Sequence, residues 1–293
     1  MSKATNISAS VRAQLNNHAR AQHVDFSRFL TNYGLERLLY RLANSPYRDE
    51  FVLKGAMLFS CWSGDIHRAT KDVDFLKMGN VSIARLEQIF SELCEMETDV
   101  DDGLVFDASS IKAEEIREDN SYGGTRVTLK AYLGKAMISV QADIGVGDMI
   151  TPAAKEIEFP TVLDMPSPKL KAYPAETVIA EKFEAMVSIG FTNSRMKDFY
   201  DIWAIYKFLN PDQQVVNQAI SNTFKRRGTT IPSEVPIALT DEFSKDKTKQ
   251  QQWIAFIRRA GVTQKAQPTL HETIAYIRPL LIGAMIEEAE TKP

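Results

Sequence analysis

The sequence has few cysteines, no long apolar run and no strong charge of either sign. Only two of the 293 residues are cysteine, and neither Cys61 nor Cys94 stands in a Cys-x-x-Cys or Cys/His cluster. A zinc cluster and a disulfide framework are therefore excluded. No stretch approaches the roughly 20 apolar residues that cross a bilayer, and the N-terminus lacks a signal peptide's apolar segment. We therefore expect a cytoplasmic protein with no membrane partner.

The net charge of −3 hides a difference between the two parts of the chain. Residues 1–165 contain 18 basic and 24 acidic side chains, whereas residues 166–293 contain 17 and 14. An acidic part suits a divalent cation, and a mildly basic part suits a polyanion. The length allows a sizeable core, and we predict two domains, residues 1–165 and residues 166–293.

The spacing of apolar residues predicts the order of the elements in the first domain. Two helices are expected within residues 7–44, ended by Ser45-Pro46. A short apolar run at 51–55 closes on Gly55 and opens into a buried helix at 56–62. The next segments predict a strand, an amphipathic helix and three further strands, the last two joined as a hairpin by Gly134-Lys135, at 72–78, 81–96, 104–116, 124–134 and 136–146.

Five prolines between residues 151 and 174 predict a linker or an edge excursion rather than a helix. From Ala175 onward the pattern is helical, with breaks at glycine and proline. The predicted fold class is therefore α+β, a mixed sheet with flanking helices followed by a helical C-terminal domain.

Acidic residues inside the apolar run at 72–78 predict a metal site. Alternation along a strand places Asp72 and Asp74 on one face, and Asp143 can supply a third carboxylate from a neighbouring strand. Carboxylate oxygens suit Mg²⁺, which takes its other ligands from water and from nucleotide phosphates. Ion-paired or solvent-facing strand acids are the alternative.

A second Asp-x-Asp, Asp99 and Asp101, shows how weak this pattern is alone. It precedes Asp102 and Gly103 directly after a predicted helix, which favours a solvated turn. The first pair is stronger because burying two carboxylates without a cation is costly.

A second group of charged residues surrounds a helix break at Gly190. At about 1.5 Å per residue, Lys182 before the break and Asp201 after it lie at similar height on two antiparallel helices. Asp198 shares a helix face with Asp201. Such a lysine could bind phosphate, with the acids orienting it or activating a hydroxyl. Ordinary ion pairs across a helical hairpin are the alternative.

Two basic clusters in the second domain raise the possibility of a polynucleotide partner. They are residues 225–227 and Arg258-Arg259, with Phe224 and Trp253 as candidate stacking faces. Solvated surface charge is the alternative.

Four ordered motifs resemble the AbiEii/AbiGii family of nucleotidyltransferase toxins. They are FVLKGAMLFSCW, RATKDVDF, QADIGV and YPAETVIAEKFEAMVSIGFTNSRMKDFYDIW, and the resemblance spans roughly residues 50–205. It implies a polymerase-β-like nucleotidyltransferase sheet and a helical C-terminal domain. It also implies Mg²⁺, an NTP substrate, a tRNA acceptor in some relatives, and a separate antitoxin that is often a transcriptional regulator, in a type IV system.

The resemblance assigns roles to single residues. Asp72 and Asp74 correspond to the metal-binding pair, and Asp143 to the third acid. Lys182 corresponds to the nucleotide-binding lysine, and Asp201, with Asp198 as a second candidate, to the late acid of the family's motif.

The remaining implied contacts concern phosphate. Lys54 and Gly55 stand in the first motif, Arg68 and Arg195 would be phosphate-side cations, and Thr70 replaces a serine that contacts phosphate or becomes modified. One departure is Ala56, where relatives have glycine or serine, because alanine lacks the hydroxyl and limits positive φ. Nucleotide preference is left open by this change.

The resulting hypothesis is a Mg²⁺-dependent enzyme that transfers a nucleoside monophosphate from an NTP to an acceptor, expected to be tRNA. The helical C-terminal domain would contribute Lys182 and Asp201 to the cleft that contains Asp72 and Asp74. Protein AMPylation or a kinase-like transfer on the same metal site is one rival. A non-catalytic binding module that keeps the fold is another.

Overall fold

The computed structural model describes residues 3–63, 70–79, 82–118, 122–260 and 268–290. The chain divides into two compact units. Unit 1 comprises residues 1–66, 70–147 and 156–172, and unit 2 comprises residues 67–69, 148–155 and 173–293. The predicted domain boundary at 165/166 therefore falls within a segment of unit 1. Among the described helices, none has the length and apolar character needed to span a bilayer.

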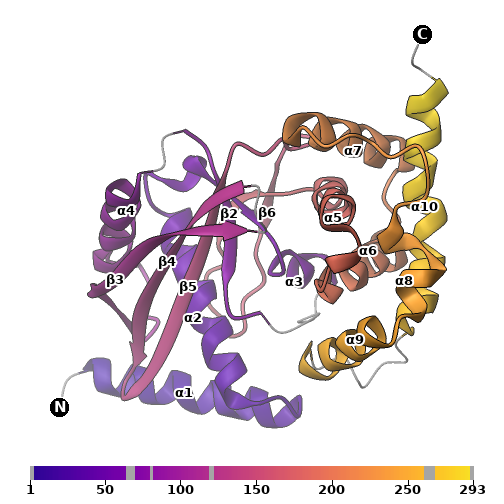
Figure 1. The fold of residues 1–293 in the computed structure, drawn as a ribbon. Helices are drawn as coiled ribbons and strands as arrows, with labels where there is room; N and C mark the ends of the chain where they lie inside the picture. The colour runs from indigo at the N-terminus through magenta and orange to yellow at the C-terminus, as the bar shows by residue number, and fades with distance from the viewer. Residues whose placement is uncertain (1–2, 64–69, 80–81, 119–121, 261–267, 291–293) are drawn as a thin grey trace. The chain divides into compact units, whose positions relative to one another are not determined.

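Unit 1 is built on a mixed seven-stranded sheet with the order β3-β4-β5-β2-β1-β7-β6 (Figure 1). At its centre, β2 runs antiparallel to β1 and parallel to β5. The polar end of β2 is therefore flanked by two strands that can bring side chains to it. The bounds are β1 (Phe51–Lys54), β2 (Val73–Lys77), β3 (Leu104–Glu118), β4 (Tyr122–Leu133), β5 (Ala136–Val146), β6 (Lys155–Glu158) and β7 (Lys169–Ala172).

Helix α2 is the central helix of unit 1. The Asp25 side chain caps it by accepting the Ser27 N–H at 2.8 Å. Most of its residues are buried, and a Cβ added at Gly34 would lie 3.0 Å from Ile138 of β5. Glycine therefore allows the helix to approach the sheet closely. The helices of unit 1 are α1 (Lys3–Ala21), α2 (Phe26–Ala43), α3 (Leu58–Ser63) and α4 (Ile83–Glu95).

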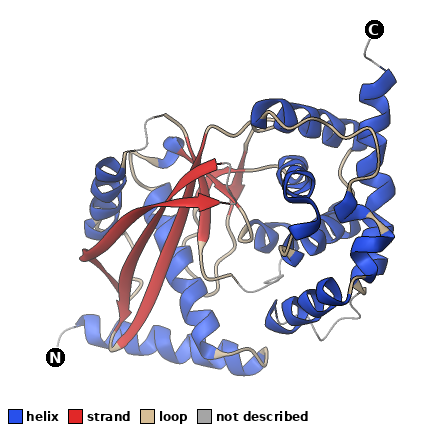
Figure 2. Cartoon of the chain, viewed as in Figure 1, coloured by secondary structure: helices blue, strands red, loops and turns tan. Residues whose placement is uncertain are grey.

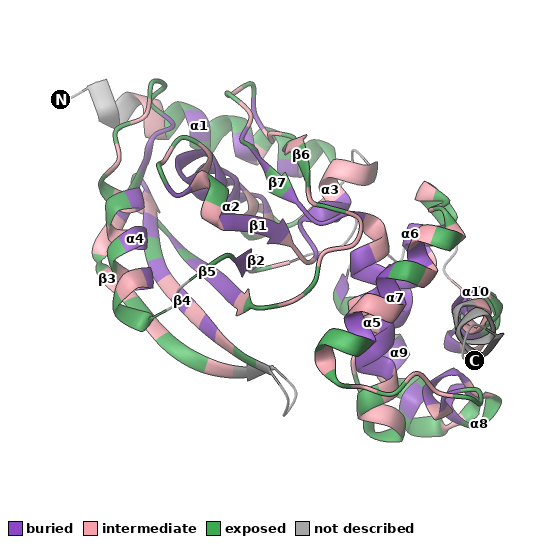
Figure 3. Cartoon of the chain, turned by 90° about the horizontal axis from the view of Figure 1, so that it is seen from above, coloured by how far each residue is buried: buried purple, intermediate pink, exposed green. Residues whose placement is uncertain are grey.

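The strands β4 and β5 alternate between buried and more exposed residues along their length (Figure 3). Val127, Leu129 and Ala131 are buried on β4, and Ile138, Val140 and Ala142 on β5. Alternation places these residues on one face, where they form the core, and leaves the intervening residues on the other face. The polar positions that carry the site are placed in this way.

A buried acid anchors α2 to the start of β3. Asp102 accepts hydrogen bonds from Arg37 Nε at 3.2 Å and Arg41 Nη1 at 2.7 Å, and the Tyr33 hydroxyl donates to its carbonyl oxygen at 2.8 Å. Asp99 and Asp101 in the same turn are exposed. The turn predicted for this second Asp-x-Asp is present, and its structural anchor is the next residue.

The proline-rich segment is an edge excursion that returns to the sheet. It forms β6 and β7, and β7 pairs in parallel with β1 through Leu53 and Ala172. Glu36 accepts the Val162 N–H at 2.7 Å, and Arg37 donates to the Pro166 carbonyl at 3.0 Å. Two neighbouring charged residues of α2 therefore hold the excursion in place.

Unit 2 consists of helices (Figure 2), as the sequence predicts for residues after Ala175. Its core includes Phe183, Phe199, Phe224 and Phe243, all with 0% exposure. The predicted α+β class, a mixed sheet followed by helices, is confirmed. The bounds of the six α-helices are α5 (Ala175–Ile189), α6 (Met196–Leu209), α7 (Gln213–Arg227), α8 (Asp241–Lys245), α9 (Lys247–Ala260) and α10 (Leu270–Glu290).

Burial raises the pKa of Glu36 from its ordinary value of 4.5 to about 7. The folded state therefore binds a proton more tightly than the unfolded state, and the free energy of unfolding should fall as pH rises from about 4.5 through 7. The loss should be on the order of 3 kcal/mol. We expect Glu36→Gln to remove this part of the pH dependence, measured by urea unfolding between pH 5 and pH 8. Equal slopes for both proteins would contradict the assignment.

Candidate active site

Charged side chains line up across five neighbouring strands of unit 1. Lys54 of β1 pairs with Asp74 of β2, Asp74 with Asp143 of β5, Asp143 with Arg126 of β4, and Arg126 with Glu114 of β3. Residues directly opposite each other on paired strands point to the same face of the sheet. We call these five residues the charged row. It brings the predicted residues Lys54, Asp74 and Asp143 together.

The Asp74 carboxylate lies directly against the backbone of Gly55. A Cβ added at Gly55 would lie 1.8 Å from Asp74 Oδ2, and the glycine has φ +76°. Any other residue there would meet the carboxylate and also adopt a left-handed conformation that L side chains disfavour. The Lys-Gly pair of the first motif therefore has a structural reason, which is close approach to an acid.

The ammonium group of Lys54 extends toward β5. A Cβ added at Gly145 would lie 3.4 Å from Lys54 Nζ. Gly145 stands two residues beyond Asp143 on the same face of the strand. The lysine thus brings a positive charge beside the two acids of the row, which lowers their mutual repulsion.

Asp72 stands one residue before β2, two residues from Asp74. The Thr70 hydroxyl donates to the Asp72 carboxylate, and Thr70 Oγ1 also lies 3.2 Å from the Asp72 carbonyl oxygen. The hydroxyl that the sequence places near phosphate is therefore held by the first acid of the pair. Arg68, the other predicted cation of this motif, lies outside the described residues.

Asp143 is held by an arginine that the sequence analysis did not single out. Arg126 donates from Nε to Asp143 Oδ1 at 2.8 Å and from Nη2 to Oδ2 at 2.7 Å. This bond to Asp143 raises the pKa of Arg126, so the guanidinium stays charged. The signal was present, because a two-residue turn at Gly134-Lys135 pairs Leu133 with Ala136 and, counting back, Arg126 with Asp143.

Asp72 and Asp74 are the candidate metal ligands of unit 1. Their carboxylates are hard oxygen ligands, and Mg²⁺ is commonly bound by one or two of these plus water and substrate phosphates. Within the described ranges, no three His, Cys, Asp or Glu side chains gather closely enough to form a metal site. The acid pair therefore fits a site whose other ligands come from the nucleotide and water.

Ala56, the departure from the family pattern, is buried with 6% exposure. Its carbonyl accepts the Phe59 N–H at 3.2 Å in the turn that opens α3. The methyl group therefore lies within the protein, where a serine hydroxyl would need a partner.

The second predicted cluster is a buried ion-pair network in unit 2. Lys182 Nζ on α5 lies 2.7 Å from Asp198 Oδ1 and 2.9 Å from Asp201 Oδ2 on α6, and Arg195 Nε lies 2.6 Å from Asp198 Oδ2. The side chains of both acids have 0% exposure, whereas Lys182 has 12% and Arg195 has 25%. The predicted side-by-side placement is confirmed, and these are not weak surface pairs.

Burial alone would raise the pKa of Asp198, but the nearby charges of Lys182 and Arg195 dominate and hold it well below its ordinary value. Asp198 is therefore an ionised acceptor at neutral pH. Its two carboxylate oxygens accept hydrogen bonds from Lys182 and from Arg195.

The loop between α5 and α6 positions this network. Gly190 ends α5 with φ +64°. Asn193, fully buried, accepts the Arg195 N–H at 2.8 Å on its side-chain oxygen, and its carbonyl accepts from Lys249 Nζ at 2.9 Å. The loop is thus held at both faces, which fixes the start of α6 and with it Asp198.

The predicted basic clusters are only partly at the surface. Lys225 and Arg226 are exposed, but Arg227 forms ion pairs with Asp148 at 3.1 Å and Glu184 at 2.8 Å. The stacking prediction is wrong, because Phe224 has 0% exposure and Trp253 has 4%. Both aromatic rings are core residues of unit 2.

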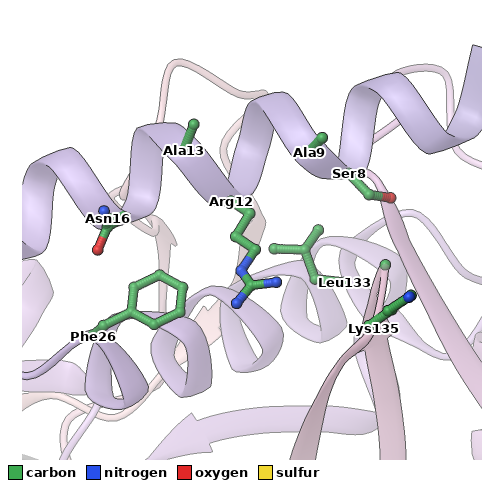
Figure 4. Close-up of a pocket in the computed structure, with 9 residues that line it drawn as sticks. Ser8, Ala9, Arg12, Ala13, Asn16, Phe26, Leu133 and Lys135 are labelled. Atoms are coloured by element: carbon green, nitrogen blue, oxygen red, sulfur yellow. The ribbon is translucent and has the colours of Figure 1, made fainter.

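A cavity of about 530 Å³ lies at the hairpin end of β4 and β5, under one face of α1 (Figure 4). Asp143 stands seven residues beyond the start of β5 at Ala136, which is roughly 23 Å along the strand. The cavity is therefore separate from the charged row, and no acid lines it. Its lining is Ser8, Ala9, Arg12, Ala13, Asn16, Phe26, Leu133, Gly134 and Lys135.

Gly55→Ala should displace the Asp74 carboxylate. We expect a loss of roughly 1–3 kcal/mol in unfolding free energy and loss of Mn²⁺ binding in calorimetry. Gly79→Ala is the matched control, since Gly79 has φ +81° but nothing within 4 Å of the added Cβ. Gly79→Ala should lose less stability, because it has only the cost of a positive φ, and it should keep Mn²⁺ affinity. Equal Mn²⁺ affinities for both variants would refute the proposed contact.

Solved structures that are similar to this chain include two proteins from Helicobacter pylori. A candidate nucleotidyltransferase is 12% identical, with a TM-score of 0.52, over 92% of this chain and 100% of that chain. JHP933 is 15% identical, with a TM-score of 0.47, over 88% and 94%. The first likeness supports the fold, a nucleotidyltransferase-like mixed sheet with C-terminal helices. No curated protein sequence matches the chain.

Comparison with sequence families gives a match over residues 37–275. This range contains the charged row, Asp72 and the network around Lys182. The matching family is described as nucleotidyl transferase AbiEii toxin, type IV toxin-antitoxin system. Because the match covers most of the sequence, the chain belongs to the AbiEii family of nucleotidyltransferase toxins.

Proposed function

We propose that this protein is a Mg²⁺-dependent toxin that transfers a nucleoside monophosphate from an NTP to tRNA in the cytoplasm and so stops translation and growth. The observation that carries the proposal is the acid pair beside a bare glycine backbone. Asp74 touches Gly55, and Asp72 is held by Thr70. When bound, Mg²⁺ would neutralise triphosphate charge and align an attack at phosphorus.

The residues of unit 1 would bind and orient the nucleotide. Asp72 and Asp74 would hold the metal, while Lys54 and the backbone at Gly55 would contact phosphate. Thr70 would keep the Asp72 carboxylate in one orientation. In the transfer, an acceptor hydroxyl oxygen forms a bond to the α-phosphorus and the bond to pyrophosphate breaks. Asp143 would stand beside the metal with its charge neutralised by Arg126.

Lys182 would serve as a phosphate-binding cation, with Arg195 as a second one. Their orientation is fixed by Asp198 and Asp201, which are buried and accept from them. A pre-oriented cation loses little entropy on binding phosphate, which supports this role. Asp201 would be the late acid of the family motif.

The partner of the toxin would be a cognate antitoxin, as the type IV family implies. The exposed cations that would contact an RNA acceptor are Lys225, Arg226, Arg258 and Arg259. They are compatible with tRNA binding, which is dominated by phosphate contacts.

Protein AMPylation and kinase-like transfer are the rival reactions on the same metal site. Each NTP would be supplied in two labelled forms, one at the α-phosphate and one at the γ-phosphate, to total tRNA and to a protein extract. Label from the α-phosphate on tRNA supports the proposal. Label from the α-phosphate found only on protein would show that the acceptor is a protein and not RNA. Label from the γ-phosphate alone would indicate a kinase.

Asp72→Asn combined with Asp74→Asn should abolish transfer and growth arrest. The loss should be on the order of 100-fold or more, because the metal loses both its protein ligands. The fold should be retained, as checked by thermal unfolding without metal, because asparagine has nearly the same shape as aspartate and the loss of repulsion between the acids offsets lost contacts to Lys54 and Thr70. Asp99→Asn with Asp101→Asn, the exposed second pair, is the matched control and should remain active. Growth arrest by the Asp72/Asp74 variant would favour the non-catalytic binding module.

Lys182→Gln should destabilise the protein by about 3–5 kcal/mol, since Asp198 and Asp201 lose a buried partner. Adding Asp201→Asn should recover part of that stability. We expect the double variant to bind NTP about tenfold more weakly than the wild type, in the range of one charge-assisted contact. Unchanged NTP affinity in the folded double variant would assign Lys182 to the fold alone. Calorimetric titration and thermal unfolding measure the two effects.

A further inference from the structure

The third acid of the charged row accepts a hydrogen bond from an arginine on each of its two oxygens. Both Asp143 oxygens accept from Arg126, at 2.8 and 2.7 Å, and the Gln141 side-chain amide lies 3.3 and 3.4 Å from the same two oxygens. The paired geometry matches the fork of a guanidinium to a carboxylate. A metal ion could reach this acid only through the lone pair left on each oxygen, beside the guanidinium charge of Arg126, which repels a cation.

The burial of the pair favours keeping it intact. The Asp143 side chain has 12% exposure and that of Arg126 has 34%. Separating the two would leave the mostly buried Asp143 carboxylate without its partner, which costs more than breaking a pair in which both side chains are exposed. Asp74 lies beside it on the neighbouring strand and Asp72 two residues before Asp74, and their carboxylate oxygens are the kind of ligand that Mg²⁺ takes.

The charge balance of the row depends on the same arginine. Asp74 and Asp143 are direct cross-strand neighbours, and Asp72 stands two residues from Asp74. Arg126 is close enough for the charge of Asp72 to contribute to its raised pKa. With Arg126 in place, Asp143 adds no net charge beside the acid pair. Without it, a third negative charge would stand there.

We infer that Arg126 is a positioning residue of the metal site. It holds Asp143 in a neutral pair outside the coordination shell, so that Asp72 and Asp74 are the only carboxylate ligands. The inference rests on the proposed function, because it takes the acid pair to be the metal site. It replaces the expectation that Asp143 is a third ligand.

The consequence is that removing the arginine tightens metal binding. Arg126→Gln leaves the Asp143 charge unneutralised near the metal, and the attraction of a unit charge for a dication about 6 Å away corresponds to about a tenfold gain in affinity. A residue with a purely structural role would give no gain. A direct contribution of Arg126 to metal binding would give a loss.

The test is Mn²⁺ titration by calorimetry without nucleotide. The variants are Arg126→Gln and Arg126→Gln combined with Asp143→Asn, a neutral pair of nearly the same shape. We expect about tenfold tighter binding for the first and wild-type affinity, within about twofold, for the second. The double variant keeps the test valid if Arg126→Gln alone does not fold, since it contains no unpaired charge. Thermal unfolding verifies the fold of each.

Two further variants serve as controls. Arg126→Lys keeps the charge and should keep the affinity within about threefold. Arg85→Gln on α4 makes the same change in net charge outside the charged row, and it should leave Mn²⁺ affinity unchanged.

The outcomes separate this inference from the proposed function. A double variant that binds Mn²⁺ more than about tenfold more weakly would make Asp143 a ligand and overturn the inference. A folded Arg126→Gln variant that binds Mn²⁺ no more tightly than the wild type would also overturn the inference. The assignment of Asp72 and Asp74 as metal ligands would be unaffected by that result. Wild-type protein that binds no Mn²⁺, with or without NTP, would remove the proposed metal site itself.

Discussion

The contact between the Asp74 carboxylate and the Gly55 backbone is the constraint on which the site depends. It joins the end of β1 to β2 and leaves no room for a side chain at Gly55. The same strand pairing aligns Lys54 with Asp74, so one turn supplies a cation and a bare backbone to one acid. Metal binding, phosphate contact and the conformation of the turn are therefore linked at a single point of the sheet.

The charged row extends this constraint across the sheet. Acids placed side by side on neighbouring strands repel each other. The two adjacent acids of the row, Asp74 and Asp143, have a cation on either side, which limits the repulsion. Arg126 is the cross-strand neighbour of Asp143, and Lys54 is the cross-strand neighbour of Asp74. Asp72 lies just outside β2, and its carboxylate accepts the Thr70 hydroxyl. An excess of negative charge is thus kept at the acid pair, where a cation would bind.

Unit 2 contains carboxylates that are buried inside the protein. Two fully buried acids are matched by two cations, so the network around Lys182 is close to neutral. Such a network is rigid because removing any member leaves a buried charge. Arg227 with Asp148 and Glu184 follows the same rule within this unit. A cation presented from such a network keeps one orientation, which suits phosphate recognition but also serves the fold.

Local sequence determined the elements of this protein and the hairpin register. Periodicity set the helices and strands, the turn at Gly134-Lys135 placed Arg126 opposite Asp143, and the break at Gly190 placed Lys182 beside Asp201, because each depends on residues near in sequence. Only the tertiary structure decided that β2 lies between β1 and β5, that Asp102 is a buried anchor, and that Phe224 and Trp253 are core residues. Those outcomes depend on the packing of segments far apart in the chain, which no local pattern encodes.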